Sequence, residues 1–388
     1  MGMTVERLNP DQLIAEAIRQ SGCTDFGPAP MMEGFEVFCD ALYAEAQLDE
    51  AGRRKVTDEL VNILSQRLQV EDWYKRHPEI EAVEIKAPLF VMGLPRSGTS
   101  ATSQHFDQDP QMRTLRRWEL EWPTPPPTAA GQATDPRVKR MQDRIEARDA
   151  EDPARKAKIN TNANDPGEHG VLLKYTFLSF HNVGNFYVPS YFDWLWTQDL
   201  TPGYAYVNRV LKLLLWKCPP PQWNLRHPMD IMGIDAILSV WPDARIVWTH
   251  RDPARTVPSG VSLLEGERKQ FSPMVNHREA GSSLLAQCHA MVERGMQSRK
   301  ALPPGRIVDL YNQDLVRDPL TTMAGAYERL GLEFTDAFAE GLRNHMRTRP
   351  KGLHGEHRPD LSIYGMTVEG IRAKFADYIE QCHVPLDA

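Results

Sequence analysis

The sequence has no paired cysteines, no long apolar run and no excess of positive charge. Its five cysteines are far apart and never form a Cys-x-x-Cys pair, which disfavours a disulfide framework and a thiolate zinc site. No window approaches the roughly eighteen apolar residues that span a bilayer, and MGMTVERLNPDQL lacks the pattern of a targeting segment. We therefore expect a cytoplasmic protein without a membrane span. A net charge of -7 disfavours nucleic acid as a partner and confines any anion site to a local basic pocket.

The length and the hydrophobic content of the sequence are those of a soluble globular protein. Its 388 residues, 41% of them hydrophobic, are enough to bury a sizeable core. Residues 10–84 carry helical patterns, and in DELVNILSQRL four apolar side chains share one helix face before His77-Pro78 ends the run: Leu60, Ile63, Leu64 and Leu68. We expect residues 1–84 to form a helical N-terminal cap and residues 85–388 to form an α/β domain.

Three apolar segments of the second part predict buried strands: LFVM at 89–92, RIVWT at 245–249 and RIVDLY at 306–311. Each precedes a turn and a helical stretch, which is typical of a parallel sheet flanked by helices. Helices are also expected at 137–150 and 204–216, inside a helical, aromatic-rich insertion at about 137–223. Near the end of the chain, Thr367 can cap a helix. The predicted fold class is α/β, with a P-loop-like parallel sheet.

The segment FVMGLPRSGTS (90–100) joins the first strand to a helix through a glycine-rich turn. Gly93 and Gly98 have the spacing of a nucleotide-triphosphate loop, but Thr99 stands where that loop needs lysine. Backbone N–H groups of such a turn still bind an anion, and Arg96 supplies a cation that can grip phosphate oxygens. Hydroxyl groups surround it at Ser97, Thr99 and Ser100. Because no apolar strand ends in an aspartate suited to magnesium, we expect no metal.

G-L-P-R-S-G-T-S after a strand resembles the 5'-phosphosulfate loop of sulfotransferases that use 3'-phosphoadenosine 5'-phosphosulfate (PAPS), in particular the bacterial branch related to tyrosylprotein sulfotransferases. Other stretches similar to this family occur in the expected order, including EDWYKRHPEI, WEL, WPDARIVWTHRDP and YGMTVEGIRAKFADY. The resemblance implies PAPS as the donor, adenosine 3',5'-bisphosphate (PAP) as the product and a small molecule with a hydroxyl group as the acceptor. It implies that the donor is bound by Arg96, Ser97, Gly98, Thr99 and Ser100.

The resemblance also implies a second group of donor-binding residues, Arg251 and Ser259, which we call the second grip. The family holds the 3'-phosphate with an arginine just after a strand and a serine eight residues later, and RIVWTHRDPARTVPSG places Arg251 and Ser259 at this spacing. Asp252 can cap the following helix and Pro253 can take its first position, which puts Arg251 at the positive end of the helix. Pro258 is expected to disturb this helix and to help turn Ser259 toward the ligand.

Two side chains are candidates for the base that takes the acceptor's proton. Glu119, in RRWELEW, matches the place of a catalytic glutamate in related sulfotransferases; the alternatives are an exposed acid or a pair with Arg116 or Arg117. His227, in WNLRHPMD, is the other candidate, and its alternative is a structural histidine. Most members of this branch have Leu-Lys-Ser-Pro here, so Arg226 replaces the lysine that contacts the transferred group, and the arginine changes the geometry.

Two further expectations concern the closing loop and the acceptor. In HRPDLSIYG, which resembles the loop that closes over the donor, Arg358 is expected to approach the 3'-phosphate or adenine, although Pro359 replaces the usual aromatic residue. Residues 175–223 contain 13 of the 33 Phe, Trp and Tyr side chains. Such density suits a pocket for a lipophilic or aromatic alcohol, or core packing, or a homodimer surface.

Two rival functions remain open at this point. A P-loop kinase is disfavoured by the missing lysine. A sulfotransferase-like protein that binds the nucleotide without transferring sulfate is kept open by the replacements at Arg226 and His227.

Overall fold

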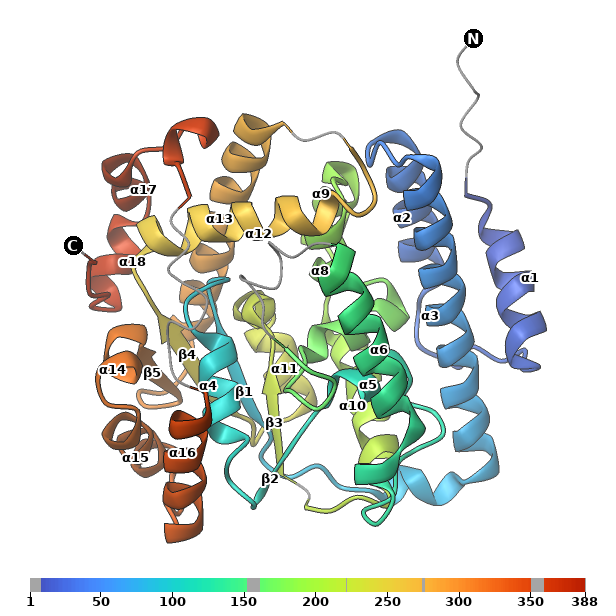
Figure 1. Cartoon of the computed structure of the whole chain (residues 1–388), viewed down its shortest axis with the longest axis horizontal. Coiled ribbons are helices and arrows are strands. Elements are labelled where there is room, and N and C mark those ends of the chain that lie inside the picture. The colour runs from blue at the N-terminus through green and yellow to red at the C-terminus, as the bar shows by residue number, and fades with distance from the viewer. Residues whose placement is uncertain (1–7, 152–160, 221, 274–275, 350–358, 388) are drawn as a thin grey trace.

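The computed structural model describes residues 8–151, 161–220, 222–273, 276–349 and 359–387. Its centre is a five-stranded sheet in the order β2-β3-β1-β4-β5, with every neighbouring pair parallel (Figure 1). The strands are β1 (Leu89–Gly93), β2 (Met112–Thr114), β3 (Gln222–Arg226), β4 (Arg245–His250) and β5 (Ile307–Tyr311). The α/β fold class with a helix-flanked parallel sheet is confirmed.

The sequence predicted β1, β4 and β5 but not β2 and β3. β2 has three residues, and β3 reads QWNLR, so neither shows an apolar run. Yet Asn224 and Arg226 of β3 are buried, with exposures of 1% and 4%. Their polar side chains have partners: Asn224 Nδ2 donates to the carbonyl oxygen of Ser103 on α4 at 2.9 Å and to Oγ1 of Thr114 on β2 at 3.1 Å, and Arg226 donates to Glu168. Hydropathy does not detect a strand whose buried groups are polar and paired.

Alternate residues of β1 belong to two hydrophobic clusters on opposite faces of the sheet, as the period of a strand requires. Leu89 and Val91 pack with Phe106 and with side chains of α15 (Pro319–Leu330) and α16 (Asp336–Thr348). Phe90 and Met92 belong to the larger cluster, which extends into the N-terminal helices and the insertion.

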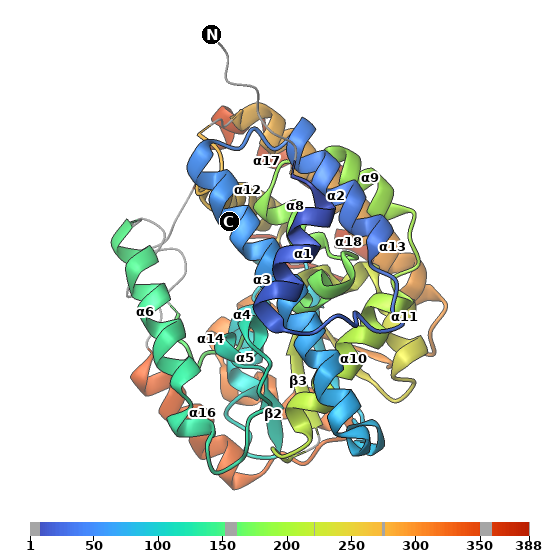
Figure 2. The same ribbon diagram turned by 90° about the vertical axis from the view of Figure 1, so that its right-hand side faces the viewer.

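The N-terminal helices are α1 (Pro10–Ser21), α2 (Met32–Ala44) and α3 (Glu50–Arg76), followed by the short 3-10 helix η1 (Pro78–Ala82). They lie together on one side of the molecule (Figures 1 and 2). All four apolar side chains predicted to share one face of α3 are buried. Arg67 of α3 is fully buried and donates to the carbonyl oxygens of Phe26 and Tyr175, which ties the helices to the insertion. A domain boundary near residue 85 stays a prediction.

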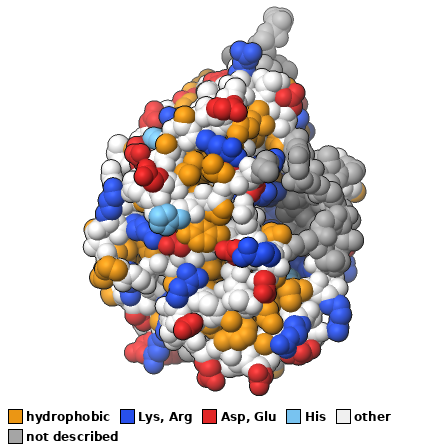
Figure 3. Space-filling view, turned by 90° about the vertical axis from the view of Figure 1, so that its left-hand side faces the viewer, with side chains coloured by type: hydrophobic (Ala, Val, Ile, Leu, Met, Phe, Trp, Pro, Cys, Tyr) orange, Lys and Arg blue, Asp and Glu red, His pale blue; other side chains and the backbone are white. Residues whose placement is uncertain are grey.

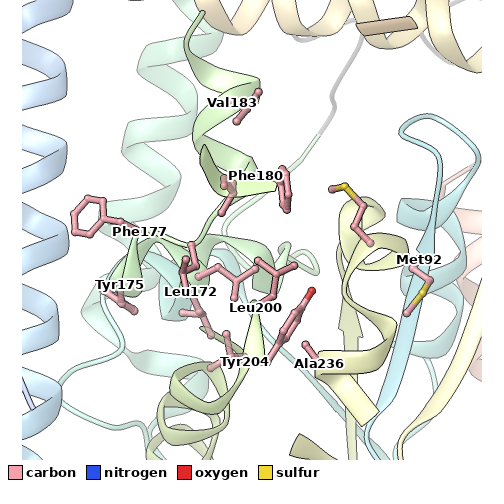
Figure 4. Packing of buried hydrophobic residues seen from close by; sticks show 14 of the residues in the cluster. Met92, Leu172, Tyr175, Phe177, Phe180, Val183, Leu200, Tyr204 and Ala236 are labelled. Carbon is pink, nitrogen blue, oxygen red and sulfur yellow. The ribbon is translucent and has the colours of Figure 1, made fainter. Parts of the chain in front are cut away.

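The helices expected in the insertion are present as α6 (Pro136–Glu151) and α10 (Thr201–Leu215). Between them lie η3 (His169–Thr176), α8 (Phe180–Asn185) and α9 (Pro189–Trp196). Figure 4 shows side chains of η3, α8 and α10 gathered in one packed layer. Eight of the 13 aromatic residues of this stretch are buried in the large cluster: Tyr175, Phe177, Phe180, Phe186, Tyr191, Tyr204, Tyr206 and Trp223. Core packing therefore accounts for most of the aromatic density.

The remaining elements are α4 (Thr99–Phe106), α5 (Arg117–Glu121), η2 (Gln132–Thr134), η4 (Pro228–Met232), α11 (Ile234–Val240), α12 (Pro253–Arg268), α13 (His277–Lys300), α14 (Asn312–Arg317), η5 (Leu361–Tyr364), α17 (Val368–Lys374) and α18 (Ala376–Gln381). Thr367 caps α17 as predicted, accepting from the backbone of Gly370 at 3.0 Å. Pro258 lies inside α12, which continues through it, and the expected local disturbance of the helix stays a prediction.

The last two features of the fold are the apolar character of the helices and the distribution of charge on one face. None of the helices in the described ranges has the length and apolar character needed to cross a bilayer. On the face shown in Figure 3, acidic and basic side chains are interspersed, with no extended patch of one charge.

Candidate active site

The predicted donor-binding groups meet at the carboxyl edge of the sheet, because all five strands are parallel and end there. β1 runs into the turn at 93–98, β3 into Arg226 and His227, and β4 into Arg251. Ligands of open α/β sheets bind at this edge.

The turn at 93–98 needs glycine at two positions. Gly93 has φ 149°, and a Cβ there would lie 2.4 Å from the carbonyl oxygen of Thr249. Gly98 has φ 108°, and a Cβ there would lie 2.6 Å from the side-chain nitrogen of Asn312 on α14. Arg96 also has a positive φ, 72°, which is uncommon for a residue with a side chain and occurs most often at functional sites. The backbone is therefore bent tightly around a small space at the start of α4.

The three hydroxyl groups of the loop have different surroundings. Ser97 is fully buried, and its Oγ lies 2.7 Å from Oγ1 of Thr249, so that this hydroxyl joins the loop to β4. Thr99 is also buried, with an exposure of 3%. Ser100 is exposed and accepts a 2.5 Å hydrogen bond from Nη1 of Arg226.

Arg96 connects the loop to the second predicted grip. Its Nε donates to Oγ of Ser259 on α12 at 3.1 Å. Burial, together with the nearby charge of Arg251, lowers the pKa of the Arg96 guanidinium. Arg96, Arg251 and Ser259 thus lie together, although they come from two different strand-to-helix junctions. Among the described residues Arg96 has no acidic partner, and two adjacent guanidinium groups favour a bound anion.

Arg251 itself faces an acidic side chain from the C-terminal region. Its Nε lies 3.5 Å from Oδ2 of Asp387, and Nε of Arg255 lies 3.6 Å from the same oxygen. Asp252 caps α12 as predicted, accepting from the backbone N–H of Ala254 at 2.9 Å. A carboxylate therefore lies against the arginine that is predicted to hold a phosphate.

Arg226 and His227 meet an acid that the sequence did not single out. Nη1 of Arg226 donates to Oε1 of Glu168 at 2.8 Å, and Nδ1 of His227 lies 3.6 Å from Oε2 of the same carboxylate. Burial opposes ionisation of Glu168, but the charge of Arg226 and the contact with His227 hold the pKa of this carboxyl far below its usual range. His181 of α8 also faces this group, and burial lowers its pKa to about 4.

Glu119, the other predicted base, has a structural environment. Its side chain is fully buried. Oε1 accepts from Nη2 of Arg113 at 2.6 Å, and Oε2 accepts from the backbone N–H of Arg116 at 2.9 Å, where it caps α5. The ion-pair partner is Arg113, not Arg116 or Arg117 as the alternative supposed. The geometry does not support Glu119 as the proton acceptor, because both carboxylate oxygens are used inside the fold.

Several residues near the site were missed, and Arg358 lies outside the described residues. Glu168 precedes η3 in the loop NDPGEHG, which has no pattern that marks a site. His181 and Asp387 likewise carry no local signal, because each reaches the site only through the packing of distant elements. Arg255 could have been found, because it follows Arg251 by four residues at the start of α12. The described residues contain no cluster of three or more His, Cys, Asp or Glu side chains that could hold a metal ion.

The chain is an α/β protein in which the turn at 93–98 lies beside Arg251 and Ser259 at the carboxyl edge of a parallel sheet. The model of the sulfotransferase family matches residues 88–336, and the chain belongs to this family. No curated protein gave a significant match. The relation to the tyrosylprotein branch stays a prediction.

Two solved structures are similar along the whole chain. Sulfotransferase STF9 from Mycobacterium avium is 27% identical with a TM-score of 0.90, and the match covers 100% of both chains. Sulfotransferase STF1 from Mycobacterium tuberculosis is 29% identical with a TM-score of 0.86, and covers 96% of this chain and 99% of its own.

Proposed function

We propose that the protein transfers a sulfuryl group from PAPS to the hydroxyl group of a small lipophilic or aromatic acceptor. The observation that carries this proposal is the hydrogen bond between Arg96 and Ser259, with Arg251 beside them. This hydrogen bond joins the turn at 93–98 to Ser259. One ligand with anionic groups at two places could therefore contact the turn and the Arg251-Ser259 pair at once. A nucleoside triphosphate has all its phosphates at one end and does not need the second grip.

The residues of the site fit this donor in charge and shape. The turn is too tight for side chains at Gly93 and Gly98, so its backbone N–H groups can approach a phosphosulfate closely. Arg96 would neutralise the phosphate that leaves with PAP, while Arg251 and Ser259 would hold the 3'-phosphate. Arg226, at Ser100, stands where it can stabilise charge on the transferred group.

The donor supplies an activated sulfuryl group. As the acceptor oxygen bonds to sulfur and the bond from sulfur to the phosphate oxygen breaks, a base must take the acceptor's proton. His227 is the proposed base, because both of its ring nitrogens are buried and neither has a partner within 3.5 Å among the described residues, the nearest contact being Nδ1 to Oε2 of Glu168 at 3.6 Å. An unpaired buried polar group is rare and suits a site that a ligand completes.

The proposed acceptor class rests on the position of α8. The ring of His181 lies 6.3 Å from that of His227, and the adjoining Phe180 packs on Phe192 and Trp196, with ring centroids 6.0 Å and 6.4 Å apart. Phe180 itself is buried, so the aromatic surface offered to an apolar acceptor on this side would come from His181 and from the partly exposed Phe192 and Trp196.

Calorimetric titration with PAP, compared with ATP and magnesium, tests the donor. Tighter binding of PAP is expected, and preference for ATP would favour the kinase alternative. A screen of labelled PAPS against pooled phenols, alcohols, sugars and lipids then tests transfer. Binding of PAP without transfer to any pool would favour the non-catalytic alternative.

A further inference from the structure

The contacts of Glu168 point to a role that rests on the proposed function and extends it. We propose that Glu168 is a positioning residue that holds Arg226 at Ser100 and orients His227, so that one imidazole nitrogen faces the carboxylate and the other takes the acceptor's proton. The acid, the histidine and the arginine would act as one unit.

The first support is the shared carboxylate. Each oxygen of Glu168 faces a different neighbour: Oε1 accepts from Arg226 at 2.8 Å, and Oε2 lies 3.6 Å from Nδ1 of His227. Contacts of a catalytic histidine are often long before substrate binds and shorten in the complex. A proton on Nδ1 that points toward Oε2 leaves Nε2 with its lone pair, which is the form needed to accept a proton.

The second support is the space around the His227 ring. A Cβ at position 170 would lie 2.5 Å from three atoms of this ring, Cε1, Nδ1 and Nε2, so the ring rests directly on the backbone of Gly170. The side chain of His227 is 3% exposed. Packing sets the orientation of a ring confined in this way. Glu168, two residues before Gly170, would then decide which ring nitrogen carries the proton.

The third support is the arginine. The Arg226 side chain is 5% exposed, and its guanidinium donates to Ser100 and Glu168 and, at 3.3 Å, to the carbonyl oxygen of Pro166. Breaking a buried ion pair by removing one partner leaves an uncompensated charge. Without its carboxylate, Arg226 would repel a proton from the neighbouring imidazole and would lose its fixed place at the loop.

Other groups around His227 leave Glu168 as the nearest acid. His169 of η3 and His181 of α8 have ring centroids 5.9 Å and 6.3 Å from that of His227. The acid next to His169 is Asp230 of η4, whose Oδ2 lies 3.0 Å from Nε2 of His169 and whose Oδ1 accepts from Tyr204. Arg226, His169 and His181 carry no negative charge, so Glu168 supplies the carboxylate that faces His227.

NMR of the imidazole nitrogens tests this coupling without an acceptor. The ring nitrogen signals of the full-length protein are recorded, and those of His227 are assigned by their loss in His227→Gln. In the parent protein they should show the proton on Nδ1, the nitrogen that faces Glu168. In Glu168→Gln the proton should move to Nε2, because Arg226 takes the amide oxygen and the amide NH2 then faces Nδ1; Glu168→Asp, which keeps the carboxylate, should retain the proton on Nδ1. A proton that stays on Nδ1 in Glu168→Gln would overturn the proposal.

Kinetics test the positioning role itself, with labelled PAPS and whichever acceptor pool the protein sulfates. Glu168→Gln should lower kcat by about 100-fold or more, in the range of general base catalysis, while the Kd of PAP changes little. In a His227→Gln background the same change should have a much smaller effect, since residues that act as one unit are not additive. An equal loss in both backgrounds would refute action through His227.

The matched control is Glu265→Gln. Glu265 is a buried acid that also pairs with a histidine, its Oε1 lying 2.7 Å from Nδ1 of His277, and it should leave kcat unchanged. Absence of transfer by the unaltered protein would contradict the proposed function, and the NMR spectra would still decide the coupling of Glu168 to His227.

Discussion

Replacing Arg251 with alanine should separate the two proposed grips on the donor. The guanidinium lies beside Arg96 and Ser259, at the start of α12, where it would contact a 3'-phosphate but not a 5'-phosphate. A hydrogen bond to a charged group contributes about 1.5–3 kcal/mol. The Arg251 side chain is 30% exposed, so solvent screens it, and we expect a loss toward the low end, about 2 kcal/mol, which is about 30-fold in Kd.

The assay compares two ligands that differ only in the 3'-phosphate. Calorimetry with PAP should show the full loss in Arg251→Ala, whereas AMP should bind with nearly unchanged affinity. The difference should shrink as salt is added, because the group is partly exposed. Arg317→Ala, which removes an arginine that is 78% exposed, serves as the control. Equal losses for PAP and AMP would refute the assignment of Arg251 to the 3'-phosphate.

Four further outcomes are expected. Asp387→Asn should tighten PAP binding several-fold in calorimetry, since it removes a carboxylate that competes for Arg251; weaker binding would contradict this. Glu119→Gln should lower the free energy of unfolding in urea by about 3 kcal/mol, because Arg113 loses its buried partner, and a loss of kcat without loss of stability would return the base role to Glu119. Burial opposes ionisation of Asp309, but hydrogen bonds from Arg299 and a buried histidine hold its pKa well below normal. The ionised carboxylate therefore stabilises the fold at neutral pH, and this contribution is lost as pH falls below about 4. Asp309→Asn should lower the free energy of unfolding in urea at pH 7, and the difference from the parent protein should disappear in acid. Chelation of divalent ions should not abolish transfer, and dependence on magnesium would contradict the expectation that the reaction needs no metal.

Long elements with a clear period were predicted well from the sequence. The apolar face of α3 and the strands β1, β4 and β5 are found where the pattern indicated them, because each buries a repeated apolar surface. The two missed strands, β2 and β3, are short and partly polar. Their burial depends on partners such as Ser103, across from Asn224, which no local pattern reveals. Pro258, predicted to disturb α12 locally, lies inside a helix that continues through it.

The candidate site also contains residues that local patterns predicted and residues whose surroundings only the structure shows. The Arg96 loop and the spacing of Arg251 and Ser259 are local patterns, and the structure brings these residues together. The role of Glu119 as the base stays a prediction from its place in the sequence, and only the structure shows that its oxygens accept from Arg113 and from the backbone at the start of α5.

The sequence by itself determined that a glycine turn with an internal arginine follows a buried strand, and that a second arginine begins another helix. These are consequences of backbone chemistry over about ten residues. Only the tertiary structure decided which acid faces which base, because Glu168 and His227 are 59 positions apart and meet through the packing of η3 against the end of β3. Charge interactions depend on distance in space, and the chain between two residues does not state that distance.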